Sequence, residues 1–308
     1  MKRFFILASA AIVALASCAK TEVVNTDGPQ EIAFKQLTGP ITKGETLSAA
    51  IQLGVYAHQG ENLYFGNTAF THNGTDWTGN RYWPYDKSGL DFTVYAPYSS
   101  HTETTYDSTN KILTVGDVTA GEASYYGSQR YLGVTKPDLN AAYPVILKHM
   151  SSKISVSVKG TDDVYKVTSL VLDEPVVSGE VDVNYTNNTA PTVAVVADPA
   201  PTKADISFLD NGATAVELTT TAVKVGEDEF VLPGEQTSFT ITFDQYTNGI
   251  DKTEKLSFSE TIDLTDTWVA NKHYHYTINI SAEEIHLTAT VEDWDTVTEV
   301  PVELPKQN

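Results

Sequence analysis

Two histidines, His273 and His275, are the residues of this sequence best suited to binding a metal ion. They lie two positions apart in a segment that alternates polar and apolar residues, so on a β-strand both imidazoles would point to the same face. Two imidazoles can begin a zinc site, but such sites need three or four ligands, and no third ligand is evident nearby. Because Tyr274 and Tyr276 alternate with them as inward-facing residues, we expect two exposed sheet residues and neither a metal ion nor a cofactor.

Carboxylates surround Trp294 near the C-terminus, and Glu292, Asp293 and Asp295 are candidates for the acid and base of a glycosidase. Such a pair must face each other across a substrate at about 5–9 Å, which neighbours on one strand or turn rarely do. Solvated charges at a strand end are the more common arrangement. The sequence also lacks a Gly-rich phosphate loop, an HExxH segment and a nucleophile elbow, so we expect no enzyme.

Four aromatic residues lie close together between Gly74 and Ser88, namely Trp77, Tyr82, Trp83 and Tyr85. Aromatic rings in loops can stack on sugars, so a host glycan is a candidate ligand. A host protein is the other candidate. Packing into a core, or covering the edge of a sheet, is the more common fate of such residues.

The composition limits the class of protein. Of 308 residues, 41% are hydrophobic, and 40 Asp and Glu outnumber 20 Lys and Arg, which gives a formal charge of −20. Phosphate backbones repel a protein this acidic, so we expect no nucleic-acid partner. Cys18 is the only cysteine, which excludes a disulfide within the chain and a cysteine-based zinc site.

The N-terminus has the organisation of a lipoprotein signal peptide over residues 1–17. A basic start is followed by an apolar run that is too short to span a bilayer as a helix. The run ends in Leu15-Ala16-Ser17-Cys18, which resembles the lipobox of bacterial lipoproteins and implies that Cys18 is acylated. Ala19 in place of Asp implies transfer to the outer membrane, with residues 18–29 as a tether. The alternative is a plain secretory signal with an accidental cysteine.

From Glu31 onward the sequence has the period of β-strands. Short runs alternate apolar and polar residues, helical periodicity is nearly absent, and turn-forming pairs such as Asn73-Gly74 and Pro233-Gly234 bound the runs. The clearest runs are 154–158, 181–185, 239–243, 274–280 and 287–291. This pattern predicts an all-β chain that folds as antiparallel β-sandwiches.

The length fits two domains of ordinary size. A loop at residues 136–140 precedes a new alternating pattern that starts near Pro144. We therefore expect an N-terminal β-sandwich over residues 30–148 and a C-terminal β-sandwich over residues 149–308.

Several segments together resemble the fimbrillin family, the pilins and pilus-associated lipoproteins of type V pili in Bacteroidia. After the lipobox, the segments are EIAF at 31–34, ITKG at 41–44, WP at 83–84, LDFTVYAP at 90–97, LKHMSSKI at 147–154, SGEVD at 178–182, VLP at 231–233, TWVANKHYHYT at 267–277 and VEDW at 291–294. The resemblance covers most of the mature chain. It implies two transthyretin-like β-sandwich domains in tandem.

The resemblance also implies assembly by strand exchange. In that family a surface protease cuts behind the first strand, which leaves, and a strand of a neighbouring subunit fills the groove. Here the first strand would lie at about 30–38, with Ile32 and Phe34 as groove-filling side chains. The loop behind it carries one basic residue, so we expect cleavage between Lys43 and Gly44. Many relatives have Arg at this point; Lys counts against an arginine-specific protease, and an uncut loop is the alternative.

Residues 297–305 are the candidate donor strand, because Val300, Val302 and Leu304 alternate with other residues. Pro301 and Pro305 count against this role, since proline has no N–H to offer a neighbouring strand. The alternatives are a frayed tail and the last edge strand of the C-terminal domain.

The sequence therefore predicts a structural and adhesive pilus subunit that is exported as a lipoprotein to the outer membrane and cell surface. Its partners would be other pilin subunits. The alternative is a permanently lipid-anchored outer-membrane protein that binds a glycan or a protein and never polymerises. The two differ in the fate of residues 18–43, which a shaft subunit should lose and an anchored receptor should keep.

Overall fold

A computed structural model describes residues 29–36, 48–86, 89–101, 103–121, 123–131, 142–160, 165–187, 190–235, 237–246, 254–265, 267–281 and 285–294. Within these ranges the chain forms strands β1 to β24 and one 3-10 turn at Tyr98–Ser100, without an α-helix. The prediction of an all-β chain is thereby confirmed. The described residues contain no helix of the length and apolar character that a membrane span requires.

The first part of the chain forms a sheet that folds over into two layers. Its strands are β1 (Glu31–Gln36), β2 (Leu53–Gln59), β3 (Asn62–His72), β4 (Trp77–Tyr82), β5 (Leu90–Ala96), β8 (Tyr125–Tyr131), β9 (Tyr143–Val145) and β10 (Lys148–His149). They are ordered β10-β8-β5-β2-β3-β4-β1-β9. β3 pairs with β2 over most of its length and with β4 only at Thr71 and His72, so the sheet turns at this strand.

A further sheet covers the outer face of β2, β5 and β8. It contains β6 (Thr105–Asp107), β7 (Ile112–Thr119), β13 (Val176–Asn184), β14 (Thr192–Val195) and β15 (Thr202–Lys203). Tyr56, Tyr95 and Tyr126 pack with Leu113 and Val181 in the core between the layers. Because both faces of β2 and β5 are covered, six of the seven residues in each strand are buried.

The second part of the chain forms a sandwich of two sheets. Its strands are β11 (Ser152–Gly160), β12 (Tyr165–Asp173), β16 (Ile206–Leu209), β17 (Val216–Glu217), β18 (Val223–Val231), β20 (Ser238–Tyr246), β21 (Lys255–Asp263), β23 (Lys272–Ile280) and β24 (Ile285–Asp293). One sheet is ordered β18-β11-β23-β24 and the other β16-β12-β20-β21, and β19 (Gly234–Glu235) pairs separately with β22 (Thr267–Trp268). The alternating residues of 154–158, 239–243 and 274–280 supply its core, as the sequence predicts.

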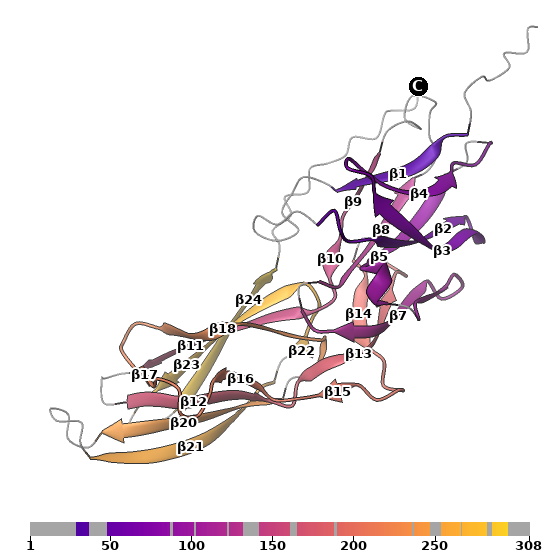
Figure 1. The fold of residues 1–308 in the computed structure, drawn as a ribbon. Coiled ribbons are helices and arrows are strands. Elements are labelled where there is room, and N and C mark those ends of the chain that lie inside the picture. Colours follow the sequence, from indigo (N-terminus) through magenta and orange to yellow (C-terminus); the bar gives the residue numbers. More distant parts are fainter. Residues whose placement is uncertain are drawn as a thin grey trace, which may run out of the picture.

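Most neighbouring strands are antiparallel, but two pairs among the described residues are parallel: β1 with β9, and β11 with β23. Figure 1 shows an elongated molecule with the two sandwiches at opposite ends and the β7–β13 sheet between them. In that sheet Val183 lies opposite Leu113, so strands from both sides of residue 148 pair with each other. The domain boundary at residue 148 stays a prediction.

Asn271 connects three distant segments where the two ends of the molecule meet. Its Oδ1 accepts a hydrogen bond from the backbone N–H of His149 at 3.1 Å, and its own N–H donates to the Ser151 carbonyl at 2.9 Å. Its carbonyl accepts a bond from the Trp294 N–H at 3.0 Å. With φ at +60°, the residue is in the left-handed region, which asparagine enters more readily than most residues.

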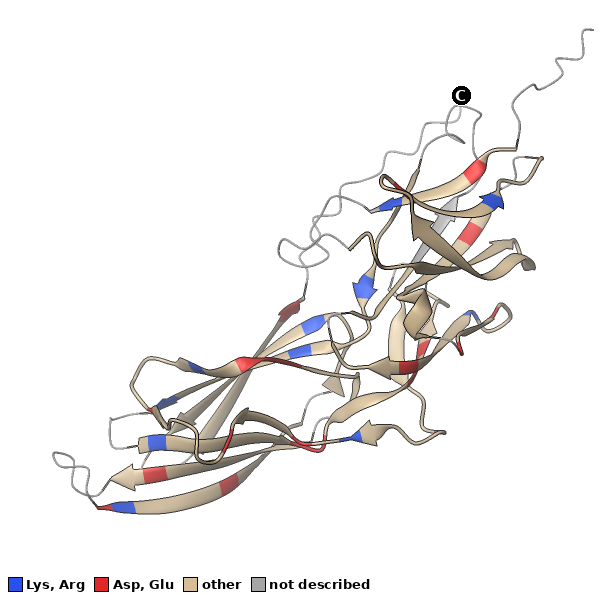
Figure 2. Ribbon diagram, viewed as in Figure 1, with Lys and Arg blue, Asp and Glu red and all other residues tan. Residues whose placement is uncertain are grey.

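Charged side chains are spread over strands of both ends of the molecule, and acidic and basic residues are interspersed (Figure 2). In the described part of the molecule the charged residues are therefore not confined to one end.

Candidate functional site

The strand β1 lies between two other strands at one end of the molecule (Figure 1). On one side it pairs antiparallel with β4, where Phe34 lies opposite Trp77. On the other side it pairs in parallel with β9, where Phe34 lies opposite Tyr143. Because both of its edges are hydrogen-bonded, loss of β1 would leave two unpaired edges about 10 Å apart, the space of one missing strand.

The side chains of Ile32 and Phe34 point into the core and are fully buried. The ring of Phe34 lies 5.2 Å from the ring of Phe70 and 5.0 Å from that of Phe92, measured between centroids. Lys35 is exposed. The structure therefore places both candidate groove-filling residues on the inward face of the strand, while their part in strand exchange stays a prediction.

The floor beneath β1 is apolar and aromatic. The buried residues of this cluster include Phe65, Phe70, Trp77, Trp83, Leu90 and Phe92. Burying a side chain of the size of Ile or Phe stabilises a fold by about 1.5–3 kcal/mol. β1 is thus held by side-chain burial as well as by its two ladders of hydrogen bonds, and its departure would expose this floor to water.

The beginning of β1 is also anchored to β4. The pairing with β4 shifts register between Glu31 and Ala33. At this irregularity the Glu31 carboxylate accepts a hydrogen bond from the Asn80 N–H at 2.9 Å, where Asn80 has φ of +51°. The N–H of Trp83 donates to the carbonyl of Gln30 at 2.9 Å. These contacts set the register in which Ile32 and Phe34 enter the core.

Six residues predicted to take part in processing and exchange lie outside the described residues: Cys18, Lys43, Gly44, Val300, Val302 and Leu304. Acylation, cleavage and strand donation therefore stay predictions.

The four clustered aromatic residues separate into two groups. Trp77 and Trp83 are buried in the core below β1, and the Trp77 Nε1–H donates to the carbonyl of Ile51 at 2.8 Å. Tyr82 is 42% exposed and Tyr85 is 96% exposed. The two tryptophans thus have the core-packing role, and only the two tyrosines are exposed enough to stack on a sugar.

His273 and His275 share one face of β23, and a third candidate ligand lies beside them. Glu292 on β24 is directly opposite His273, and the three side chains have ligand atoms within 4.8 Å of one another. The expectation that no third ligand lies nearby is therefore wrong. A hairpin of 272–280 with 285–293 was the signal that could have revealed it, because that register sets Glu292 opposite His273.

Burial, followed by the proximity of His275, lowers the pKa of His273 from 6.5 to about 4, so its imidazole is neutral at neutral pH. The other carboxylates of this region have different roles. Asp293 forms an ion pair with Lys272, and Asp295 lies outside the described residues. Glu292 thus contacts His275, and Asp293 pairs with Lys272.

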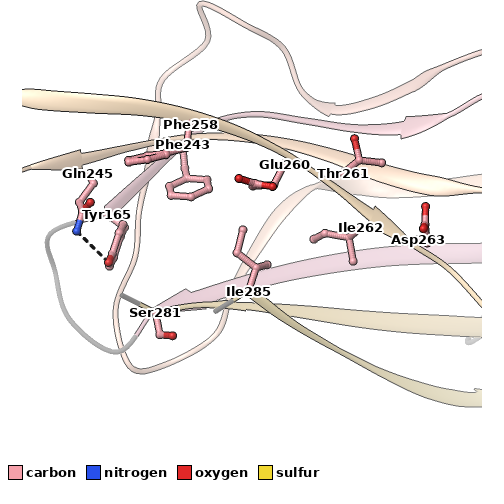
Figure 3. A pocket seen from close by; sticks show the side chains of 10 residues that line it. All are labelled: Tyr165, Phe243, Gln245, Phe258, Glu260, Thr261, Ile262, Asp263, Ser281 and Ile285. Atoms are coloured by element: carbon pink, nitrogen blue, oxygen red, sulfur yellow. Dashed lines mark hydrogen bonds between the residues drawn. The ribbon is translucent and has the colours of Figure 1, made fainter. Parts of the chain in front are cut away.

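A groove opens in the C-terminal sandwich between β21 and the start of β24, which are edge strands of the two sheets (Figure 3). The rings of Phe243 and Phe258 stack in it with centroids 5.4 Å apart. The Tyr165 hydroxyl oxygen accepts a hydrogen bond from Gln245 Nε2 at 3.1 Å. Glu260 adds a carboxylate, so the groove offers both apolar and polar contacts.

A sequence profile described as fimbrillin-like matches residues 42–294. A fimbrial protein of Bacteroides vulgatus has a similar structure, with a TM-score of 0.56 at 17% identity over 86% of this chain and 99% of that chain. A protein of Parabacteroides distasonis assigned to cell adhesion has a TM-score of 0.50 at 13% identity over 87% of this chain and 97% of that chain. At these identities the similarity is one of fold. No curated protein sequence matches the chain.

Proposed function

Because the chain belongs to the fimbrillin-like family, we propose that it is a fimbrial subunit of the cell surface that assembles with other pilin subunits by exchange of its first strand. The observation that carries this proposal is the position of β1. It is paired along both edges and buries Ile32 and Phe34, and it is the first strand along the chain among the described residues. Once the chain is cut behind such a strand, it can leave while the strands that follow it remain covalently connected to one another.

The physics of the groove favours exchange once β1 has gone. Two unpaired sheet edges and an apolar floor are unstable in water and bind an extended strand through backbone hydrogen bonds. An incoming strand must present apolar side chains at the positions of Ile32 and Phe34, because a slip of one residue would point its polar side chains inward. While β1 is in place, the groove is filled and premature polymerisation is prevented.

The order of features along the sequence couples release from the membrane to activation of the groove. Cys18, the predicted lipid anchor, and β1 both precede Lys43, the predicted cleavage point. A single cut after Lys43 would therefore remove the outer-membrane anchor and free β1 together. The candidate donor is the segment 297–305 of a neighbouring subunit.

The mature N-terminus tests this proposal directly. We expect mass spectrometry of protein from its native cell surface to find a chain that begins at Gly44. A Lys43→Gln variant should retain residues 18–43 and stay monomeric. Lys35→Gln changes an exposed lysine of β1 and serves as the matched control, which should be cut normally. An acylated Cys18 as the only N-terminus would contradict exchange of the first strand.

The groove in Figure 3 favours a second candidate function, that of a permanently anchored outer-membrane protein that binds a glycan or a protein segment. Stacked aromatic rings beside the Glu260 carboxylate and the Gln245 amide provide flat apolar contacts and hydrogen-bonding partners. In this case residues 18–43 stay in place, and Phe258→Ala should weaken binding to host cells. The same N-terminal measurement separates the two functions.

A further inference from the structure

The hairpin of β23 and β24 brings two imidazoles and one carboxylate to a single point on the surface. We infer that His273, His275 and Glu292 form a binding site for a divalent transition-metal ion, with zinc as the ion that fits best. The site is separate from β1 and its groove, and the inference does not depend on the function proposed for the chain.

The three ligand atoms lie within 4.8 Å of one another, close to the spacing of a zinc site. Oε1 of Glu292 lies 2.9 Å from Nε2 of His275 and 3.7 Å from Nδ1 of His273. In a tetrahedral site with bonds of about 2.0–2.1 Å, neighbouring ligand atoms are about 3.3 Å apart. The two distances lie on either side of that value, so small side-chain rotations would complete the geometry. Two imidazoles and one carboxylate also hold zinc in catalytic sites, where the fourth coordination position is left to water or substrate.

The backbone holds these three side chains in place. His273 and His275 are two residues apart on β23, and Glu292 lies opposite His273 on the antiparallel β24. Side chains opposite each other on antiparallel strands have Cβ atoms about 4.5–5.5 Å apart. β23 is paired on its other side with β11, so the two histidines lie on an interior strand of the sheet.

A fourth residue orients both rings. Oγ of Ser155 on β11 lies 2.7 Å from Nδ1 of His275 and 3.2 Å from Nε2 of His273. A hydroxyl oxygen has two lone pairs and can accept an N–H from each ring. The other nitrogen of each ring, which faces Glu292, then keeps its lone pair for a metal ion. Ser155 thus acts as a positioning residue shared by both ligands.

The surroundings allow an ion to enter. The side chain of His273 is 13% exposed, whereas those of His275 and Glu292 are 41% and 63% exposed. The nearby Lys153 ammonium is paired with Asp228 at 3.0 Å, which offsets its repulsion of a cation. An ion held by the three ligands would keep a coordination position toward solvent, where water would bind.

Metal titration separates this site from a simple histidine–glutamate ion pair. We expect isothermal calorimetry of the chelator-treated, uncut protein with zinc chloride at pH 7.5 to show one bound equivalent. Glu292→Gln and His275→Ala should each weaken binding by at least about tenfold, since even the loss of a second-shell partner costs about 10–100-fold. His286→Ala, which removes an exposed histidine of β24 outside the cluster, is the matched control and should bind normally.

Two further measurements keep the result interpretable if one variant folds poorly. Ser155→Ala retains all three ligands and should weaken zinc binding by about tenfold. Cobalt(II) should give the visible absorption of a low-coordinate site in the wild type and lose it in Glu292→Gln, whose exposed side chain contributes little to folding. Absence of stoichiometric zinc binding, or equal affinity in the wild type and the ligand variants, would overturn the inference.

Discussion

His101 couples the stability of the N-terminal half to pH at the scale of a single residue. Its ring is 2% exposed, with Nδ1 3.0 Å from the Gly116 carbonyl and Nε2 3.4 Å from the Ser124 hydroxyl. Burial lowers the pKa of His101 below 6.5, against the smaller raising effects of the Gly116 carbonyl and of Asp117. The folded protein therefore disfavours the charged imidazole.

The sign of the resulting pH dependence follows from proton uptake. As the pH falls below about 6.5, the unfolded chain binds a proton at His101 that the folded chain does not, so the free energy of unfolding decreases. We expect urea unfolding at pH 7.5, 6.5 and 5.5 to show this loss of stability, and His101→Gln to reduce its slope. His58 and His273 also have lowered pKa values, so a slope should remain.

The control for this prediction is His286→Gln, which changes an exposed histidine and should keep the wild-type slope. An unchanged slope in His101→Gln would show that another group carries the pH dependence.

The sequence predicts which residues of one strand share a face, but it does not predict contacts between residues of distant segments. The alternation of 272–280 correctly predicts that His273 and His275 share a face, and that Tyr274 and Tyr276 are buried. It does not reveal Ser155, which is more than a hundred positions away and reaches the site only because β11 pairs with β23. The role of Asn271 is hidden for the same reason, since its partner His149 belongs to another strand.

At the scale of elements, alternation of apolar and polar residues correctly predicts strands that have one buried face. It does not predict the burial of strands that a third layer covers on their second face. β20 and β23 follow the alternation closely. β2 and β5 do not, because β7 and β13 cover the face that a two-layer sandwich would leave in water. On β24, an edge strand, Val291 is 49% exposed although the alternation of 287–291 predicts a buried face.

The strand β1 yields a prediction at this scale. Replacing Phe34 by Ala removes the ring that packs on Phe70 and Phe92 and leaves a cavity in a fully buried position. Such truncations cost about 3–5 kcal/mol, and here the loss weakens the hold of the groove on β1. We expect lower stability in urea unfolding of the uncut chain. The uncut variant should also bind a synthetic peptide of residues 30–37 faster than the wild type does.

Lys35→Ala provides the comparison, because it changes an exposed side chain of the same strand and should alter stability by no more than about 0.5 kcal/mol. If Phe34→Ala and Lys35→Ala had the same effect on stability and peptide binding, β1 would not be held by its inward side chains.

At the scale of the whole molecule, elongation and charge both bear on assembly. The two sandwiches lie at opposite ends of the molecule, and β1 lies at one of those ends (Figure 1). A terminal groove of this kind suits end-to-end joining, because a neighbour can dock there without covering the other sandwich. The chain has a formal charge of −20, and acidic residues lie at both ends of the described part of the molecule. Neighbouring subunits therefore repel each other until a specific strand contact overcomes the repulsion.

The last prediction concerns the strand that would make this contact. Deleting residues 297–308 from the full chain, which keeps β1 in its groove, should leave a folded monomer, because the last described strand ends at Asp293. After cleavage at Lys43, this deletion should abolish polymerisation. Pro301→Thr should strengthen polymerisation, since it restores an N–H at a position where a strand between two edges needs its donors. Size-exclusion chromatography and electron microscopy measure the polymer, and circular dichroism tests the fold. If the deletion polymerised like the parent chain, the donor would have to lie elsewhere, and residues 297–305 would be a tail or an edge strand of their own domain.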